Sequence, residues 1–206
     1  MSEAIPFVHP AIVHYLFPPV KTQERRVFRE LSMPRAVHGH VRDRLAAEEG
    51  LGVDDLIDMM GARFELVARI GAHESDTVLF RTHMAPGKLV PLHSHADPEC
   101  FYLLEGEIEV FVVDDAAKWR TINAGRSILL ANGVKHAVRN QTEKTADIVL
   151  ATNNRFASFL AEAGRRVKPD TVFSAPSPAD IQRVMRVSRA YGYWNATPAE
   201  SAATTG

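Results

Sequence analysis

Residues 87–106, GKLVPLHSHADPECFYLLEG, decide the fold of this chain. The stretch contains His93 and His95, and because side chains alternate between the two faces of a strand, both imidazoles project to the same face. Glu99 follows His95 by four residues, an even number, so it rejoins that face if the turn at residues 96–98 keeps the register. The stretch therefore predicts two imidazoles and one carboxylate on one face of adjoining strands.

A second stretch, GRSILLANGVKHAVRN at residues 125–140, supplies a third imidazole. Gly133 allows a tight turn with positive φ just before the strand that carries His136. Between the two stretches, residues 107–113 alternate acidic with apolar side chains and then become wholly apolar, as a barrel-wall strand can. A β-barrel could gather these three imidazoles and the carboxylate around a single metal ion.

In residue type and in spacing, the two stretches resemble the two motifs of the cupin superfamily. The family pattern has a proline where this chain has Ala131, which weakens the case for a rigid turn but leaves the ligand positions untouched. The resemblance implies a mainly β fold, a double-stranded β-helix or jelly-roll barrel. It also implies one divalent metal ion bound by four residues: His93, His95, Glu99 and His136. Cupins that keep the fold without a metal are the alternative.

Short segments separated by Gly, Asn and Asp indicate an antiparallel double-sheet barrel of about eight strands. These strands are expected near residues 63–70, 77–84, 89–95, 99–104, 107–113, 127–131, 135–140 and 146–152. The single cysteine, Cys100, excludes an internal disulfide and is expected to pack within its strand.

Helical patterns flank the barrel on both sides, so the fold is expected to carry N-terminal and C-terminal helical extensions. The expected organisation is an N-terminal arm and helices over 1–60, the barrel over 61–152, C-terminal helices packed on the barrel over 153–195, and a flexible tail over 196–206. Apolar spacings of three and four predict N-terminal helices over 23–31, 35–49 and 53–60, and a C-terminal helix over 154–162.

The last helix has a clear start. Ser177 is the expected N-cap, Pro178 falls in the first turn and Asp180 stands at the capping-box position, while Gly192 ends the helix. A barrel followed by a short helix rich in Phe and then by a helix that begins with Pro and ends in Tyr-Gly resembles the quercetin-dioxygenase-like group of bacterial cupins.

Residues of the same parity as the ligands are expected to line a substrate pocket. Phe101 and Leu103 follow Glu99 in this way, and Val138 follows His136. His83 is a further candidate because its strand leads directly into the first motif, although alternation favours the opposite, more apolar face of that strand as the interior. The predicted pocket is mostly apolar, with the metal at its wall.

Three imidazoles and one carboxylate would leave an octahedral ion two free positions, and they suit Fe, Mn, Ni, Co, Cu or Zn without choosing among them. By resemblance, the expected function is an oxygen-dependent dioxygenase that acts on a small apolar or aromatic substrate. Glu99 would be both a ligand and the catalytic proton acceptor. The alternatives are a redox-neutral metal-dependent isomerase or lyase, and a non-catalytic small-molecule-binding cupin.

Composition narrows the class of protein further. The chain has 206 residues, 46% of them hydrophobic, enough for one good core, and a formal net charge of −1. The 24 basic and 25 acidic residues are interspersed, which disfavours capture of nucleic acid or an anionic membrane. The sequence shows neither a long apolar run nor a leader pattern, so a cytoplasmic location is expected. The proline-rich arm over 1–21 and the unpaired sheet edges favour a homodimer.

Overall fold

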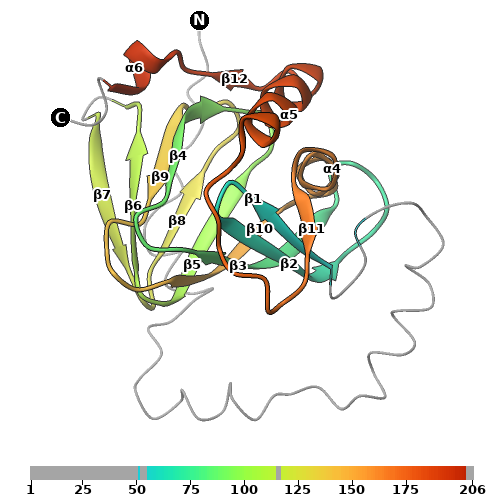
Figure 1. Cartoon of the computed structure of the whole chain (residues 1–206), viewed down its shortest axis with the longest axis horizontal. Helices are drawn as coiled ribbons and strands as arrows, with labels where there is room; N and C mark the ends of the chain where they lie inside the picture. Colours follow the sequence, from blue (N-terminus) through green and yellow to red (C-terminus); the bar gives the residue numbers. More distant parts are fainter. Residues whose placement is uncertain (1–50, 52–54, 115–116, 203–206) are drawn as a thin grey trace, which may run out of the picture. The chain divides into compact units, whose positions relative to one another are not determined.

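Two antiparallel β-sheets packed face to face make up the body of the protein, and helices follow them in the chain (Figure 1). The computed structural model describes residue 51 and residues 55–114 and 117–202. All of these belong to one compact unit, Arg42–Gly206. The arrangement is a mainly β double-stranded β-helix, as the sequence predicted.

The larger sheet of the described residues has seven strands in the order β11-β1-β2-β3-β10-β5-β8. Their bounds are β11 Arg165–Val167, β1 Leu56–Met59, β2 Ala62–Arg69, β3 Thr77–Met84, β10 Ala146–Asn153, β5 Glu99–Glu105 and β8 Ser127–Leu130. The smaller sheet has five strands in the order β12-β4-β9-β6-β7. These are β12 Trp194–Asn195, β4 Leu89–Ser94, β9 His136–Arg139, β6 Glu107–Val112 and β7 Lys118–Asn123.

The core lies between the sheets and follows from strict alternation along the strands. In β3, Val78, Phe80, Thr82 and Met84 are buried, whereas the residues between them are partly or fully exposed. The paired strand β10 buries Ile148 and Leu150 on the same side. Burial of these apolar side chains is the main stabilising contribution to the sandwich.

All eight predicted strands are present, and their ends agree with the prediction to within one residue. The expected helix over 53–60 is wrong, because Leu56–Met59 forms β1 and pairs with β2. Met60 and Gly61 join these strands with φ angles of 54° and 95°, as in a type I′ hairpin turn. The apolar spacing in this short segment suits a strand as well as a helix, and pairing with β2 decided between them. The arm and the two other N-terminal helices fall outside the described residues.

Strand β7 was not predicted. Its sequence, KWRTIN, has only one buried side chain, Ile122, so no alternation marks it as a strand. It exists because its backbone pairs with β6 over six residues, from Glu107 opposite Asn123 to Val112 opposite Lys118.

Two C-terminal helices pack beside the barrel: α4 (Asn154–Ala163) and α5 (Pro178–Ala190). Asn153 caps α4 by accepting a hydrogen bond from the Phe156 amide at 2.9 Å. The predicted capping box of α5 is present, with Ser177 and Asp180 each accepting from the other's backbone amide. Within the described part of the chain, no helix combines the length and apolarity needed to cross a membrane.

The segment after α5 is more ordered than predicted. Residues 198–202, expected in a flexible tail, form the short helix α6 (Pro198–Ala202). Gly192, with φ of 71°, turns the chain out of α5 and into β12, which pairs with β4. The C-terminal segment therefore returns to the sheet that carries the histidines.

Candidate metal centre

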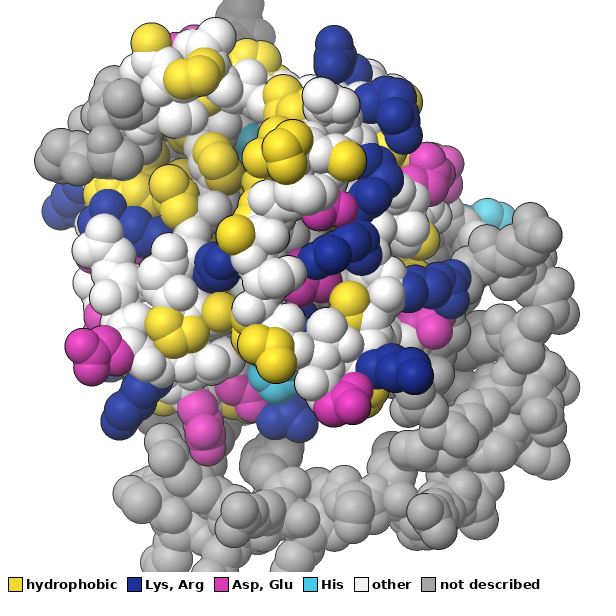
Figure 2. All heavy atoms as spheres, viewed as in Figure 1, with side chains coloured by type: hydrophobic (Ala, Val, Ile, Leu, Met, Phe, Trp, Pro, Cys, Tyr) yellow, Lys and Arg dark blue, Asp and Glu magenta, His cyan; other side chains and the backbone are white. Residues whose placement is uncertain are grey.

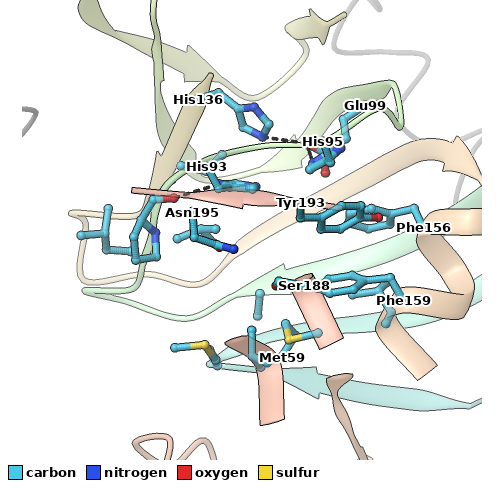
Figure 3. Close-up of a pocket in the computed structure, with 18 of the residues that line it drawn as sticks. Met59, His93, His95, Glu99, His136, Phe156, Phe159, Ser188, Tyr193 and Asn195 are labelled. Atoms are coloured by element: carbon cyan, nitrogen blue, oxygen red, sulfur yellow. Dashed lines mark hydrogen bonds and ion pairs between the residues drawn. The ribbon is translucent and has the colours of Figure 1, made fainter. Parts of the chain in front are cut away.

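The three motif histidines meet at one end of the smaller sheet. His93 in β4 lies directly opposite His136 in β9, and His95 follows just after β4. A nitrogen atom of each ring lies within 4.8 Å of those of the other two. The rings of His93 and His136 have centroids only 4.2 Å apart. Figure 3 shows that His136, His95 and Glu99 project towards the same point from different segments of the chain.

Each imidazole is oriented by a backbone carbonyl two residues away. The Nδ1 atoms of His93, His95 and His136 lie 2.8, 2.9 and 2.9 Å from the carbonyl oxygens of Pro91, Asp97 and Val134, respectively. Because a carbonyl oxygen can only accept, each Nδ1 carries the hydrogen and donates. In the neutral ring the Nε2 atom then presents a lone pair.

The Glu99 carboxylate completes the group. Its Oε2 atom lies 3.0 Å from His136 Nε2 and 3.5 Å from His95 Nε2. All three atoms are buried and have no hydrogen-bond partner. Lone pairs that face one another away from water are destabilising unless a proton or a cation lies between them. These residues therefore fit a divalent transition metal, for which imidazole nitrogen and carboxylate oxygen are ordinary ligands.

The charge states of His93 and Glu99 also suit metal binding. Burial lowers the pKa of His93 to about 3, and nearby His136 contributes to the shift, so this ring is neutral near pH 7. Burial alone would raise the pKa of Glu99, but its contacts with His136 and His95 outweigh burial and hold the pKa below its usual range. Glu99 is therefore ionised and His93 is free to act as a ligand.

The buried side chain of Asp97 holds the loop whose backbone orients His95. The Asp97 carboxylate is 2% exposed and accepts hydrogen bonds from the Tyr193 hydroxyl at 2.5 Å and from Arg155 at 2.9 Å. The Tyr193 ring also packs on His95, with centroids 5.0 Å apart. Arg155 of α4 and Tyr193, just before β12, thus fix the loop that orients one candidate ligand.

Two motif residues hold the loops rather than the metal. Gly133 has the predicted positive φ, 76°, and its amide donates to the His95 carbonyl at 2.7 Å. Asn140 is fully buried, and its side-chain amide donates to the carbonyls of Met84 at 2.9 Å and Lys144 at 2.7 Å. The second motif is therefore tied to the first and to the end of β3.

A cavity of about 260 Å³ adjoins the three histidines and Glu99. It is smaller than the roughly 300–1,000 Å³ of pockets for drug-sized ligands, so it suits a small molecule. Phe101 and Val138 line it. Ile181 and Met185 of α5 also line it and are 43% and 36% exposed, so the cavity reaches the surface beside this helix. Hydrophobic side chains gather around α5 and β12 in Figure 2.

Two predicted pocket residues lie elsewhere. Leu103 is 0% exposed in the core beyond the cavity, although it shares the inward face of β5 with Phe101. His83 lies on the outer face of β3, where its Nδ1 is 3.4 Å from Asp147, because alternation turns Thr82 and Met84 inward instead. Parity thus predicts the face of a residue but not how far the cavity extends along the strand.

The contribution of the C-terminal segment to the cavity was not predicted from the sequence. Ile181, Val184, Met185 and Ser188 form a stripe along one side of α5 and line it, and Phe156, Phe159, Tyr193 and Asn195 join them. The stripe itself was a signal that α5 covers something apolar. Strand β12 is only two residues long, so no periodicity could show that Tyr193 and Asn195 return to the histidines.

Comparison with known proteins identifies the fold family of the central segment. Residues 80–152 match the family model described as a cupin domain. No curated protein matches the chain. The match covers about a third of the chain, and β1, β2, α4, α5 and β12 lie outside the matched segment.

Several solved structures resemble the chain distantly. The Cupin_2 domain of an XRE-family transcriptional regulator from Enterobacter cloacae is 18% identical, with a TM-score of 0.38 over 45% of this chain and 96% of that one. The oxalate decarboxylase of Bacillus subtilis, described with Mn(II) centres, is 18% identical with a TM-score of 0.39, over 48% of this chain and 27% of that one. The Lactobacillus farciminis oxalate decarboxylase formate complex is 17% identical with a TM-score of 0.40, over 51% and 30%. At this distance the likeness says nothing about the reaction.

Proposed function

We propose that this protein is a metal-dependent cupin in which His93, His95, Glu99 and His136 bind one divalent transition metal ion. The observation that carries the proposal is the set of buried atoms without partners: Nε2 of His95 and of His136 and Oε2 of Glu99. The Nδ1 atoms of His95 and His136 already form hydrogen bonds with backbone carbonyls. A cation satisfies all of these atoms at once.

We further propose that the reaction is an oxygen-dependent cleavage of a small apolar or aromatic substrate. When bound, the metal would supply a Lewis-acidic, redox-active centre for a chelating substrate and dioxygen. Phe101, Val138 and the aromatic residues of α4 make the wall of the cavity beside it apolar. Glu99, an ionised carboxylate beside the substrate position, would accept the proton of a substrate hydroxyl.

The cavity wall supports this choice over a redox-neutral isomerase or lyase. Proton-shuttling enzymes usually place a second acid–base group opposite the first. Among the lining residues of the described segments, the titratable side chains are the candidate ligands and Tyr193. The Tyr193 hydroxyl is engaged by Asp97, and burial raises its pKa far above the ordinary value. The described lining residues therefore offer no second acid–base group that could exchange a proton with the substrate opposite Glu99.

The first test is the metal content of untagged protein purified without chelator, measured by mass spectrometry, followed by oxygen uptake with catechols and enols. Near-stoichiometric iron, manganese, nickel or copper together with metal-dependent oxygen uptake would support the proposal. His136→Ala should lose the metal, whereas the control His83→Ala, on the outer face, should retain it. Zinc without oxygen uptake would point to Lewis-acid chemistry. Absence of metal even after reconstitution would favour a binding barrel.

A further inference from the structure

The apolar cavity contains polar side chains that the metal centre does not use. Ser188 and Asn195 line it, and neither side chain makes a hydrogen bond within the described part of the chain. Thr82 lines it from the opposite wall, 3% exposed, and its Oγ1 atom is buried without a partner. Hydroxyl and amide groups are costly to bury unless something bonds to them. Thr82 bears this cost already, and Ser188 and the half-buried Asn195 would bear it beneath a ligand that bonds to neither of them. These polar groups on an apolar wall therefore favour a ligand that bonds to them.

The fold directs Ser188 and Asn195 into the cavity. Ser188 is 2% exposed and lies on the α5 stripe with Val184 and Met185, at helical spacings of four and three. Asn195 stands directly opposite His93 in the β12–β4 pair, and residues opposite each other in an antiparallel pair share a face. Figure 3 shows both side chains directed into the space below His93.

A backbone hydrogen bond fixes where the chain leaves α5 on its way to Asn195. The Tyr193 amide donates to the Ser188 carbonyl at 2.9 Å as α5 ends. Tyr193 and Asn195 are two residues apart in an extended segment, so both face the cavity. The position of the Asn195 amide relative to the candidate ligands is therefore set by the same segment that fixes Asp97.

The charge of the cavity limits the ligand further. Among the lining residues of the described segments there is no Lys, Arg or Asp, and Glu99 is the one carboxylate. A divalent ion with one carboxylate ligand keeps a single positive charge, which one deprotonated oxygen of the ligand would balance. A second anionic group would lie against apolar walls without a counter-charge, which is strongly unfavourable.

From these observations we infer the substrate class: a molecule that is neutral in solution, has an apolar body, and carries a hydroxyl or carbonyl group apart from its metal-binding oxygens. Ser188 and Asn195 bind this additional group and determine specificity. The inference rests on the proposed metal-dependent function. It excludes small dianions and substrates with a free carboxylate.

The binding of matched catechol analogues tests the inference without any measurement of catalysis. Protein loaded with Zn(II) is titrated calorimetrically with 4-alkylcatechols whose side chains have one, two or three carbons, and with the same compounds bearing a terminal hydroxyl. The charged probe is 3,4-dihydroxybenzoate. We expect a hydroxyl to tighten binding about five-fold at one chain length, which is typical of a neutral hydrogen bond. Ser188→Ala or Asn195→Leu should abolish that preference, and the control Met185→Leu should keep it.

The outcomes separate this inference from the proposed function. In the first outcome, alkylcatechols bind only to metal-loaded protein, but the terminal hydroxyl does not tighten binding, or tightens it as much in Ser188→Ala and Asn195→Leu as in the wild type. This outcome overturns the inference and leaves the metal site standing. Binding of 3,4-dihydroxybenzoate as tight as that of 4-methylcatechol would also overturn it. Failure of every catechol to bind to protein with stoichiometric metal would overturn both the inference and a catechol-like substrate. Zinc content is measured for each variant beforehand.

Discussion

The Tyr193 hydroxyl donates a hydrogen bond to the buried Asp97 carboxylate, which joins the C-terminal segment to the loop that orients His95. Burial and the Asp97 carboxylate both raise the pKa of Tyr193, so the hydroxyl remains a donor across the physiological range. Asp97 Oδ2 is also 3.9 Å from His95 Nδ1. Partners of this kind hold a ligand ring in place and increase its basicity.

Tyr193→Phe should therefore weaken metal binding while leaving the fold intact. Loss of a partner behind a ligand typically costs ten- to a hundred-fold in metal affinity, and we expect about ten-fold here because Arg155 still bonds to Asp97. Competition titration with Co(II) would measure it, and the visible spectrum of bound Co(II) should shift. The matched control is Tyr191→Phe, whose hydroxyl donates to Glu162 instead, at 2.6 Å. Equal effects in both variants would contradict a positioning role for Tyr193.

Much of this site was predictable from the sequence, and what was not has a physical reason. The spacing of His93 and His95 predicted their common direction because the side-chain period of a strand is two. Glu99 lies in β5 of the other sheet, so it reaches the histidines across the barrel rather than from the same sheet face. Gly133 set the entry of His136 because few other residues adopt positive φ readily. The link from Tyr193 to Asp97 spans 96 residues and depends on how α5 ends, a tertiary contact that no local pattern encodes.

The Glu99→Gln variant separates the charge of Glu99 from its shape. In the metal-free protein the contacts with His136 and His95 favour the ionised form of Glu99, so a neutral Gln loses this stabilisation and apo Glu99→Gln should melt at a lower temperature than the apo wild type. Metal should stabilise the variant less, because one anionic ligand is lost. Turnover should fall about a hundred-fold or more if Glu99 accepts the substrate proton. Calorimetry with and without Zn(II) tests the stability, and unchanged turnover would remove Glu99 from the mechanism.

Metal affinity should depend on pH through His95. Burial lowers the pKa of His95, but contacts with Glu99 outweigh it and raise the pKa above the ordinary 6.5. A ligand ring must be deprotonated, so affinity should fall as pH drops through this raised value, by up to about ten-fold per pH unit for one displaced proton. His93, with a pKa of about 3, adds nothing to the slope in this range.

Apparent dissociation constants for Zn(II) from pH 8 to pH 5.5 measure this slope. In Glu99→Gln the group that contributes most to raising the pKa of His95 is gone and only Asp97 still raises it, so the fall in affinity should begin at a lower pH than in the wild type. An identical onset in the two proteins would show that Glu99 does not control the protonation of His95.

Two glycines provide a paired test of how the motif loops are built. Gly133 and Gly106 both have positive φ, 76° and 80°, so alanine strains the backbone at either position by about 1–2 kcal/mol. A Cβ at Gly133 would meet nothing within 4 Å, whereas one at Gly106 would lie 3.1 Å from Ala146 Cα and 3.2 Å from the Thr145 carbonyl oxygen. Gly106→Ala should therefore lower the free energy of unfolding more than Gly133→Ala does. Urea denaturation of the two variants measures the difference, and equal losses would mean that the Gly106 loop moves away from β10 at little cost, contrary to the close contact seen here.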